Sequence, residues 1–297
     1  MRVVWKFLVF LVLVVVVGSL GAPLLYHAGH KVAAWGWWTF PAEVPFARYF
    51  NRSMMLAAFF GIWPFLRWTG LRRWSDLGLE HNPQSRWDLA VGFCLGTIVL
   101  IGAGLLLIYF ELFTWKDHWK AWFLVQALGT AWLVATLEEC FFRGFLLSVF
   151  SKAMGHGWAI GVVSSFFATV HFLKIHGSMV FAGPIIWTSG FDLIPYAFRG
   201  FIENTSTWVG CLSLGLLGLI LALSTLSLRS LHWAIGLHAG IIFSFKLFKG
   251  YASRSAQPDV WVAQPLYQGW TSVFLMLLLG GSSFIALRLR LGTKRTI

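Results

Sequence analysis

The sequence is poor in charged residues, and among these the acidic residues are scarcer than the basic ones. Charged residues make up 11% of the 297 positions, and Asp and Glu together number 11. An ordinary soluble domain is about a quarter charged. This shortage, set against 58% hydrophobic residues, excludes a soluble globular protein. The composition predicts an integral, multi-pass membrane protein with an all-α fold, a bundle of transmembrane helices.

Cysteine is also rare, and so is any sign of repetition. Cys94, Cys140 and Cys211 have no metal-binding spacing and form no disulfide framework, so we interpret them as small apolar side chains. The last residues, 294–297, contain no cysteine that could be lipidated. No internal repeat is visible, which disfavours a transporter built from inverted repeats.

Basic residues outnumber acidic ones, 23 to 11. They gather in short loops and in the tail, a distribution typical of the positive-inside rule, so we expect anionic lipid and no nucleic acid as a partner. The basic stretches 67–87 and 288–295 predict that both termini are cytoplasmic, whereas Lys246, Lys249 and Arg254 then fall outside. In a prokaryote the membrane would be the plasma (inner) membrane.

Hydrophobic runs set the predicted architecture. A span of about 30 Å needs close to 20 apolar residues. About eight runs meet this need within one membrane domain, residues 1–297: 5–25, 47–66, 89–110, 121–150, 157–173, 209–228, 231–248 and 270–288.

Two segments have alternative interpretations. Residues 1–22 could be a cleaved signal peptide, but the long apolar core and Pro23 favour a retained anchor. Residues 174–208 are interrupted by glycine and proline, which predicts an irregular outer loop or a re-entrant segment.

An acidic pair lies inside the fourth run. A carboxylate at the centre of a spanning helix costs about 2.5–3.5 kcal/mol, so Glu138 and Glu139 need a compensating reason, which by default is functional. Glu139 and Arg143 are four residues apart and share a helix face, which predicts a structural ion pair. Glu138 is then the chemical group. The alternative is an ionic clamp that uses both acids.

Two of the nine histidines, His171 and His238, lie well inside apolar runs. Helix rise places Glu138 about 18 Å and His171 about 21 Å from the turn that joins their two runs, so the two are nearly level. The same arithmetic places His238 about 10 Å from the start of its run, which is shallower.

One glutamate and two histidines allow two hydrolytic routes. Glu138, His171 and His238 could hold Zn²⁺ or another divalent metal and leave one position open for water. Alternatively, Glu138 is a general base, and the histidines orient the water or stabilise the oxyanion. Both routes hydrolyse an amide. A proton relay in a transporter is a further reading of the same residues.

A family resemblance rests on these residues. Glu138-Glu139-x-x-x-Arg143 is similar to the first motif of the CPBP intramembrane metalloproteases. That family includes the type II CAAX prenyl proteases and the abortive-infection and bacteriocin-processing proteins. Phe167-x-x-x-His171 is similar to its second motif.

Residues 228–240, which include His238, resemble the family's third motif. Residues 74–79 resemble a loop that often precedes the family's core. The motif-bearing region covers about 120–245. The resemblance implies an all-helical membrane fold whose active site lies within the bilayer. It implies endoproteolysis of a membrane protein or peptide, in some members a lipidated one.

By motif position, the resemblance assigns the activation of water to Glu138, pairs Glu139 with Arg143, and assigns catalysis to His171 and His238. One position departs from the family, because Ile242 stands where Asn or Asp usually follows the third-motif histidine. The alternative is therefore a catalytically degenerate member that acts as an immunity or partner-binding membrane protein.

Overall fold

The computed structural model of this chain describes residues 2–36, 43–70, 84–117, 120–175, 179, 181–203, 205–255, 261–262 and 266–292. The chain divides into two compact units, Met1–Arg72 with Thr169–Thr207, and Arg73–Ala168 with Trp208–Ile297. The prediction of a single membrane domain is not tested by this division and stays a prediction. The predicted loop motif at 74–79 and the basic residues at 293–297 lie outside the described residues.

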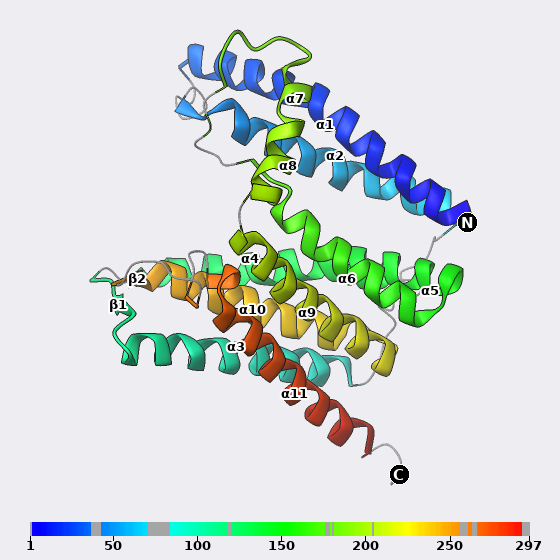
Figure 1. Ribbon diagram of the computed structural model, residues 1–297, viewed down its shortest axis with the longest axis vertical. Coiled ribbons are helices and arrows are strands. Elements are labelled where there is room, and N and C mark those ends of the chain that lie inside the picture. The colour runs from blue at the N-terminus through cyan, green and yellow to red at the C-terminus, as the bar shows by residue number, and fades with distance from the viewer. Residues whose placement is uncertain are drawn as a thin grey trace. The chain divides into compact units, whose positions relative to one another are not determined.

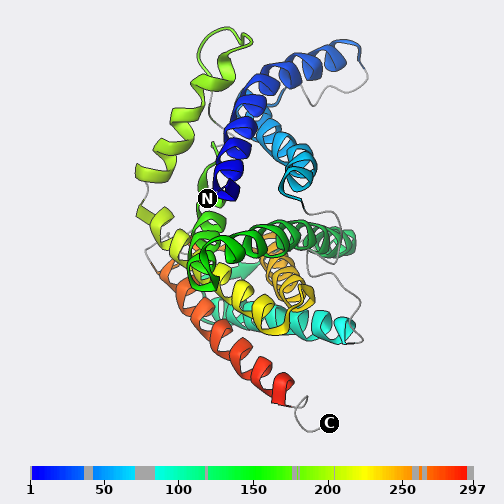
Figure 2. The same cartoon turned by 90° about the vertical axis from the view of Figure 1, so that its right-hand side faces the viewer.

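The first unit is built on two long helices, α1 (Arg2–Ala34) and α2 (Phe46–Thr69), which lie side by side (Figure 2). Small side chains allow the close approach, because a side chain at Gly18 would collide with Met54. The segment 174–208, predicted to be irregular, contains two short helices, α7 (Ser189–Asp192) and α8 (Ile194–Glu203). Helix α7 rests on α1 where Gly190 meets the backbone of Ser19.

The second unit carries most of the motif-bearing region (Figure 1). Two three-residue strands, β1 and β2, pair antiparallel in it, a small addition to the all-α prediction. Its elements in chain order are α3 (Ser85–Tyr109), β1 (Phe113–Trp115), α4 (Ala121–Glu139), the π-helix η3 (Cys140–Leu147), α5 (Ser148–Met154), α6 (His156–Phe172, whose last turn belongs to the first unit), α9 (Thr205–Leu228), α10 (His232–Tyr251), β2 (Ala252–Arg254), the 3-10 helix η4 (Leu266–Gln268) and α11 (Trp270–Gly292).

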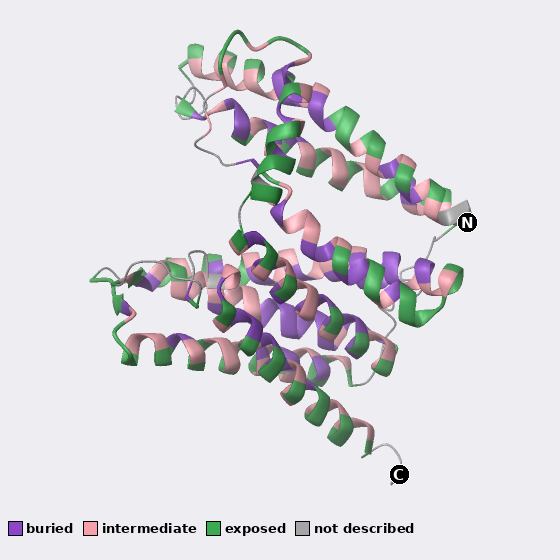
Figure 3. Cartoon of the chain, viewed as in Figure 1, coloured by how far each residue is buried: buried purple, intermediate pink, exposed green. Residues whose placement is uncertain are grey.

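Helix α10 is buried along its first half, where residues 233–240 are all buried, and Figure 3 colours buried residues purple. It packs against α3 through glycines on both helices. A side chain at Gly236 would collide with the carbonyl oxygen of Leu89, and one at Gly240 with that of Phe93. Gly92 and Gly96 of α3 face the backbone of α10 in the same way. Paired small residues let two backbones approach closely, as in membrane helix dimers.

The all-α membrane prediction is confirmed, and each of the eight predicted runs is helical in the structure. The predicted count of eight spans is not confirmed. Within the described residues, four helices are long and apolar enough to cross a membrane: Val4–Ala34, Ser85–Tyr109, Thr205–Leu228 and Trp270–Gly292. Helix α11 extends to Gly292, so Arg288 and Arg290, predicted in a tail, are helical.

Candidate active site

The acidic pair lies where the fourth run changes its helical pitch. Glu139 ends α4, and the π-helix η3 begins at Cys140. Wide turns of this kind are rare and frequently occur at functional sites. Glu139 and Arg143 form an ion pair across this change, with Arg143 Nη1 donating to Glu139 Oε1 over 2.8 Å. Neither side chain has any exposure to solvent.

Arg143 is enclosed by aromatic rings and by the backbone of α9. Its guanidinium lies 4.4 Å from the centre of the Phe167 ring and 5.7 Å from that of Phe142. Its Nη2 donates to the carbonyl oxygen of Gly218 over 3.4 Å. A side chain at Gly218 would press on Ser164 of α6, so a glycine there lets α9 come close. The ring faces and the backbone oxygen help stabilise a cation away from water.

His238 is the second group bound to Glu139. Its Nδ1 lies 2.7 Å from Glu139 Oε1, the same oxygen that accepts from Arg143. A carboxylate can only accept, so Nδ1 carries a hydrogen and donates it. In the neutral ring the other nitrogen, Nε2, then has a free lone pair. The Phe167 ring packs against the same histidine in a T-shaped contact, with the two ring centres 5.9 Å apart.

Glu138 lies on the other side of that imidazole. Its Oε2 is 3.8 Å from His238 Nε2, and its side chain is 27% exposed, whereas that of Glu139 has no exposure. The two neighbouring acids therefore differ in kind. Glu139 is sealed into an ion pair, and Glu138 faces the free nitrogen of the histidine from a partly open position.

His171 lies in the last turn of α6, four residues after Phe167, so the two share a helix face. Its side chain is half-buried. This turn is assigned to the first unit, whereas Glu138, Glu139, Arg143 and His238 belong to the second. The structure thus brings four of the five predicted site residues together, and the meeting of His171 with them stays a prediction.

The donors in the second unit fit two ligands of one metal ion. Zinc binds histidine nitrogen and carboxylate oxygen at about 2.0–2.2 Å, so two such donors can be up to about 4 Å apart. Glu138 Oε2 and His238 Nε2 meet this limit at 3.8 Å. The hydrogen bond from His238 Nδ1 to Glu139 is of the kind that commonly orients a metal-binding histidine, in which a carboxylate outside the ligand set accepts from the second ring nitrogen. Among the described residues, no group of three or more His, Cys, Asp or Glu could hold a metal ion.

Sequence reasoning missed the surroundings of Arg143. Phe167 was noted as part of a motif, but its contacts with both Arg143 and His238 were not foreseen. Gly218 is one glycine among several in an apolar run. The signal that could have found it is the absence of a side chain in a membrane helix, which often marks a close approach.

The site is thus a cluster of two acids, a histidine and an arginine within apolar helices. Residues 120–244 match the family described as Rce1-like, Type II CAAX prenyl endopeptidase. The match contains all five predicted site residues, and over this region the chain is similar to the CAAX-type proteases. The recognition from the motifs is confirmed. Comparison with curated proteins and with solved structures found no match.

Proposed function

We propose that this chain is an intramembrane endopeptidase in which Glu138 activates a water molecule with the help of His238 and His171. The observation that carries the proposal is the position of His238, held by Glu139 at 2.7 Å on one nitrogen and facing Glu138 at 3.8 Å on the other. An ion pair that served only packing would need neither the histidine nor the second, partly exposed acid.

The roles follow from the contacts. Glu139, neutralised by Arg143, fixes the tautomer and the orientation of the His238 ring. On the route without a metal, Glu138 accepts a proton from water as the water oxygen forms a bond to the peptide carbonyl carbon. It then returns the proton to the leaving nitrogen as the C–N bond breaks, so a single carboxylate serves as base and then as acid.

The proton on Nδ1 favours one of the two hydrolytic routes. A neutral His238 presents a lone pair at Nε2, which suits a metal ligand, whereas donation to an oxyanion would require a second proton on the ring. Glu138 and His238, with His171 as the predicted third ligand, would hold Zn²⁺ or another divalent ion. Such an ion, when bound, makes water a stronger nucleophile near neutral pH.

The substrate we propose is a membrane protein or peptide, lipidated near the cleavage point. The family match supports an endopeptidase of prenylated chains, and the apolar helices around the acids supply the surroundings that such a substrate requires. We further propose a multi-pass topology with both termini cytoplasmic and with anionic lipid at the basic ends.

The test is cleavage by the purified full-length chain in proteoliposomes, with a farnesylated C-terminal peptide and its unmodified counterpart as substrates. Glu138→Gln keeps the shape of the side chain but removes the base, and we expect cleavage to fall by about 10²–10⁴-fold. Glu203→Gln changes an acid that is 68% exposed and serves as the matched control. Cleavage by Glu138→Gln at the control rate would contradict the proposal.

The metal is tested separately. We expect a chelator to abolish cleavage, a divalent ion to restore it, and the purified chain to contain about one metal ion per molecule. Reduced metal content in His171→Ala and His238→Ala would support the predicted ligand set. Full activity without any metal would instead support Glu138 as an unassisted general base.

A second function, the catalytically degenerate partner-binding protein, is favoured by Ile242, which brings no polar group one turn after His238. It predicts a stable complex with a membrane partner, no turnover, and binding that survives Glu138→Gln. Cleavage by the unaltered chain would exclude it. If Ile242→Asn creates turnover that the unaltered chain lacks, the missing amide is the cause of the inactivity.

A further inference from the structure

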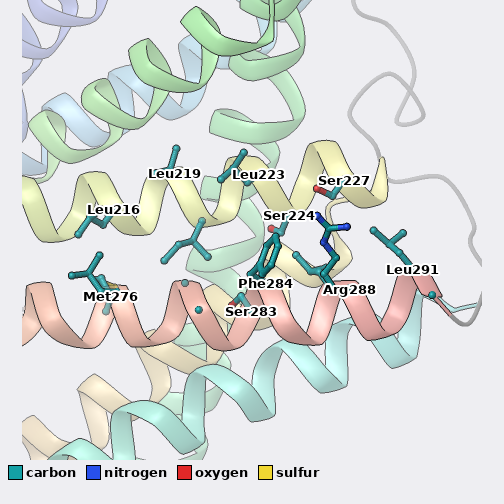
Figure 4. Close-up of a pocket in the computed structure, with 16 residues that line it drawn as sticks. Leu216, Leu219, Leu223, Ser224, Ser227, Met276, Ser283, Phe284, Arg288 and Leu291 are labelled. Atoms are coloured by element: carbon teal, nitrogen blue, oxygen red, sulfur yellow. The ribbon is translucent and has the colours of Figure 1, made fainter.

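A groove lies in the second unit, between α9 and α11. The two helices form a groove of about 900 Å³, drawn in Figure 4. Leu216 and Met276 line one end of it, and Ser227 and Arg288 line the other. Both helices are long and apolar enough to cross a membrane, so a molecule that fills the groove comes from the lipid phase.

Glycines hollow out the middle of the groove. Gly280 and Gly281 of α11 have no side chains to fill the space facing α9. A Cβ at Gly280 would lie 3.4 Å from Ile220, an ordinary contact, and one at Gly281 would have nothing within 4 Å. The apolar walls above and below this gap can therefore accept a hydrocarbon chain.

One end of the groove is polar and positively charged. Arg288 stacks on Phe284, with its guanidinium 5.0 Å from the ring centre. Among the described residues no carboxylate pairs with Arg288, in contrast to Arg290, which binds Asp88. Ser283 lines the same groove and is 2% exposed, and within the described part of the chain its hydroxyl has no hydrogen-bond partner. The positive charge of Arg288 at one end, unpaired within the described ranges, suits an anionic ligand.

The length of the groove matches one leaflet. Twelve residues separate Met276 from Arg288, a rise of about 18 Å. Half of a hydrocarbon core is about 15 Å. A chain that runs along the groove from Arg288 would thus end near Met276, at the depth where the opposite leaflet begins.

We propose that the α9–α11 groove binds one anionic phospholipid, with its phosphate on Arg288 and one acyl chain between Leu219 and Gly280. The predicted topology places the C-terminal end of α11 at the cytoplasmic leaflet, which is the one that carries anionic lipid. This site is separate from the cluster at Glu138 and does not depend on the proteolytic function.

The experiment uses the full chain in nanodiscs that contain a trace of phosphatidylglycerol with a photoreactive group on its acyl chain. Cross-linked peptides are then identified by mass spectrometry. We expect labelling of α9 and α11, and a decrease of about fivefold in Arg288→Gln, the factor that one basic residue near an anionic surface contributes. Arg86→Gln, which removes an exposed arginine from the start of α3, is the matched control.

A second pair of variants tests the chain-binding part of the groove. Gly280→Leu and Gly281→Leu fill the hollow and should also reduce the labelling, whereas Gly102→Leu, at an open position on α3, should not. Equal labelling by phosphatidylcholine carrying the same photoreactive chain would mean annular lipid only and would overturn the proposal. Labelling that survives both Arg288→Gln and Gly280→Leu would also overturn the proposal. The same holds if a farnesylated peptide reduces the labelling and unlabelled phosphatidylglycerol does not.

Discussion

Two buried ion pairs of the second unit look alike in isolation and differ in what surrounds them. Glu139 and Arg143 are joined over 2.8 Å within one continuous helical segment, and Asp88 and Arg290 over 2.9 Å between α3 and α11. In each pair one carboxylate oxygen has no hydrogen-bond partner among the described residues. Burial and pairing alone therefore do not distinguish a functional site from a helix clamp.

The two ion pairs differ in the other side chains that lie next to them. Glu139 also binds His238, whose other nitrogen faces the partly exposed Glu138. Asp88 binds Arg290 at the end of α11, where the arginine side chain is 10% exposed. A histidine fixed by one acid and open toward another can transfer protons or hold a metal. The Asp88–Arg290 pair joins α3 to α11, and we expect it to fasten the two helices.

The largest effect is expected when one member of the Glu139–Arg143 pair is removed. Glu139→Ala leaves a buried arginine without its partner and should cost about 3–5 kcal/mol of stability. Thermal unfolding in detergent measures the loss, and the expression yield should fall with it. The double variant Glu139→Gln/Arg143→Met should recover most of the stability but not the cleavage, because the His238 ring is no longer oriented. Recovery of both would show that the pair serves packing alone.

Disruption of the Asp88–Arg290 pair should lower the stability of the chain without changing its activity. Asp88→Asn should destabilise the chain by about 1.5–3 kcal/mol, the contribution of a hydrogen bond between charged groups. Cleavage per folded molecule should stay unchanged. If the rate falls as far as it does in Glu138→Gln, the distinction between clamp and site is wrong.

The glycine contact between α3 and α10 is expected to affect both properties moderately. Gly236→Ala forces α3 away from α10 at Leu89 and should cost about 1–3 kcal/mol, as overpacking does. His238 lies two residues further along α10, so cleavage should fall as well. Gly215→Ala, at a position on α9 with nothing within 4 Å, should leave both quantities unchanged, and an equal loss there would exclude a specific role for the contact.

The smallest effect is expected at an exposed pair of the first unit. Arg199 and Glu203 are 3.6 Å apart, with side chains 65% and 68% exposed. Exposed pairs at this spacing contribute about 0.3–0.5 kcal/mol, so Arg199→Gln should barely change the unfolding temperature. A loss comparable to that of Asp88→Asn would mean that exposure does not rank these pairs.

Part of the site could be read from spacing. The contact of Glu139 with Arg143 follows from a four-residue interval, which brings side chains together on any helical segment. Eight hydrophobic runs gave eight helical regions, because apolar length reports helix formation in lipid. The number of spans did not follow, since length and apolarity qualify four helices among the described residues, and α6 has 17 residues.

Other features of the molecule could not be predicted from the sequence and became visible only in the tertiary structure. The π-helix at Cys140–Leu147 has no recognised sequence pattern, and the run 121–150 was predicted as one continuous helix. Asp88 and Arg290 are 202 residues apart, and the arginine was assigned to a basic tail. The role of Arg288 at the α9–α11 groove is hidden in the same way, because a sequence does not show which helices are neighbours.

The sequence by itself determined that this is a helical membrane protein and that its motifs resemble those of the CAAX-type proteases, which the family match over residues 120–244 supports. These are local properties, set by composition, period and residue order. Tertiary structure alone decided that His238 is held by Glu139 and faces Glu138, and that α3 and α10 meet through glycines. The physical reason is that a contact between residues 99 positions apart depends on how whole helices pack, which neighbouring residues in the chain do not specify.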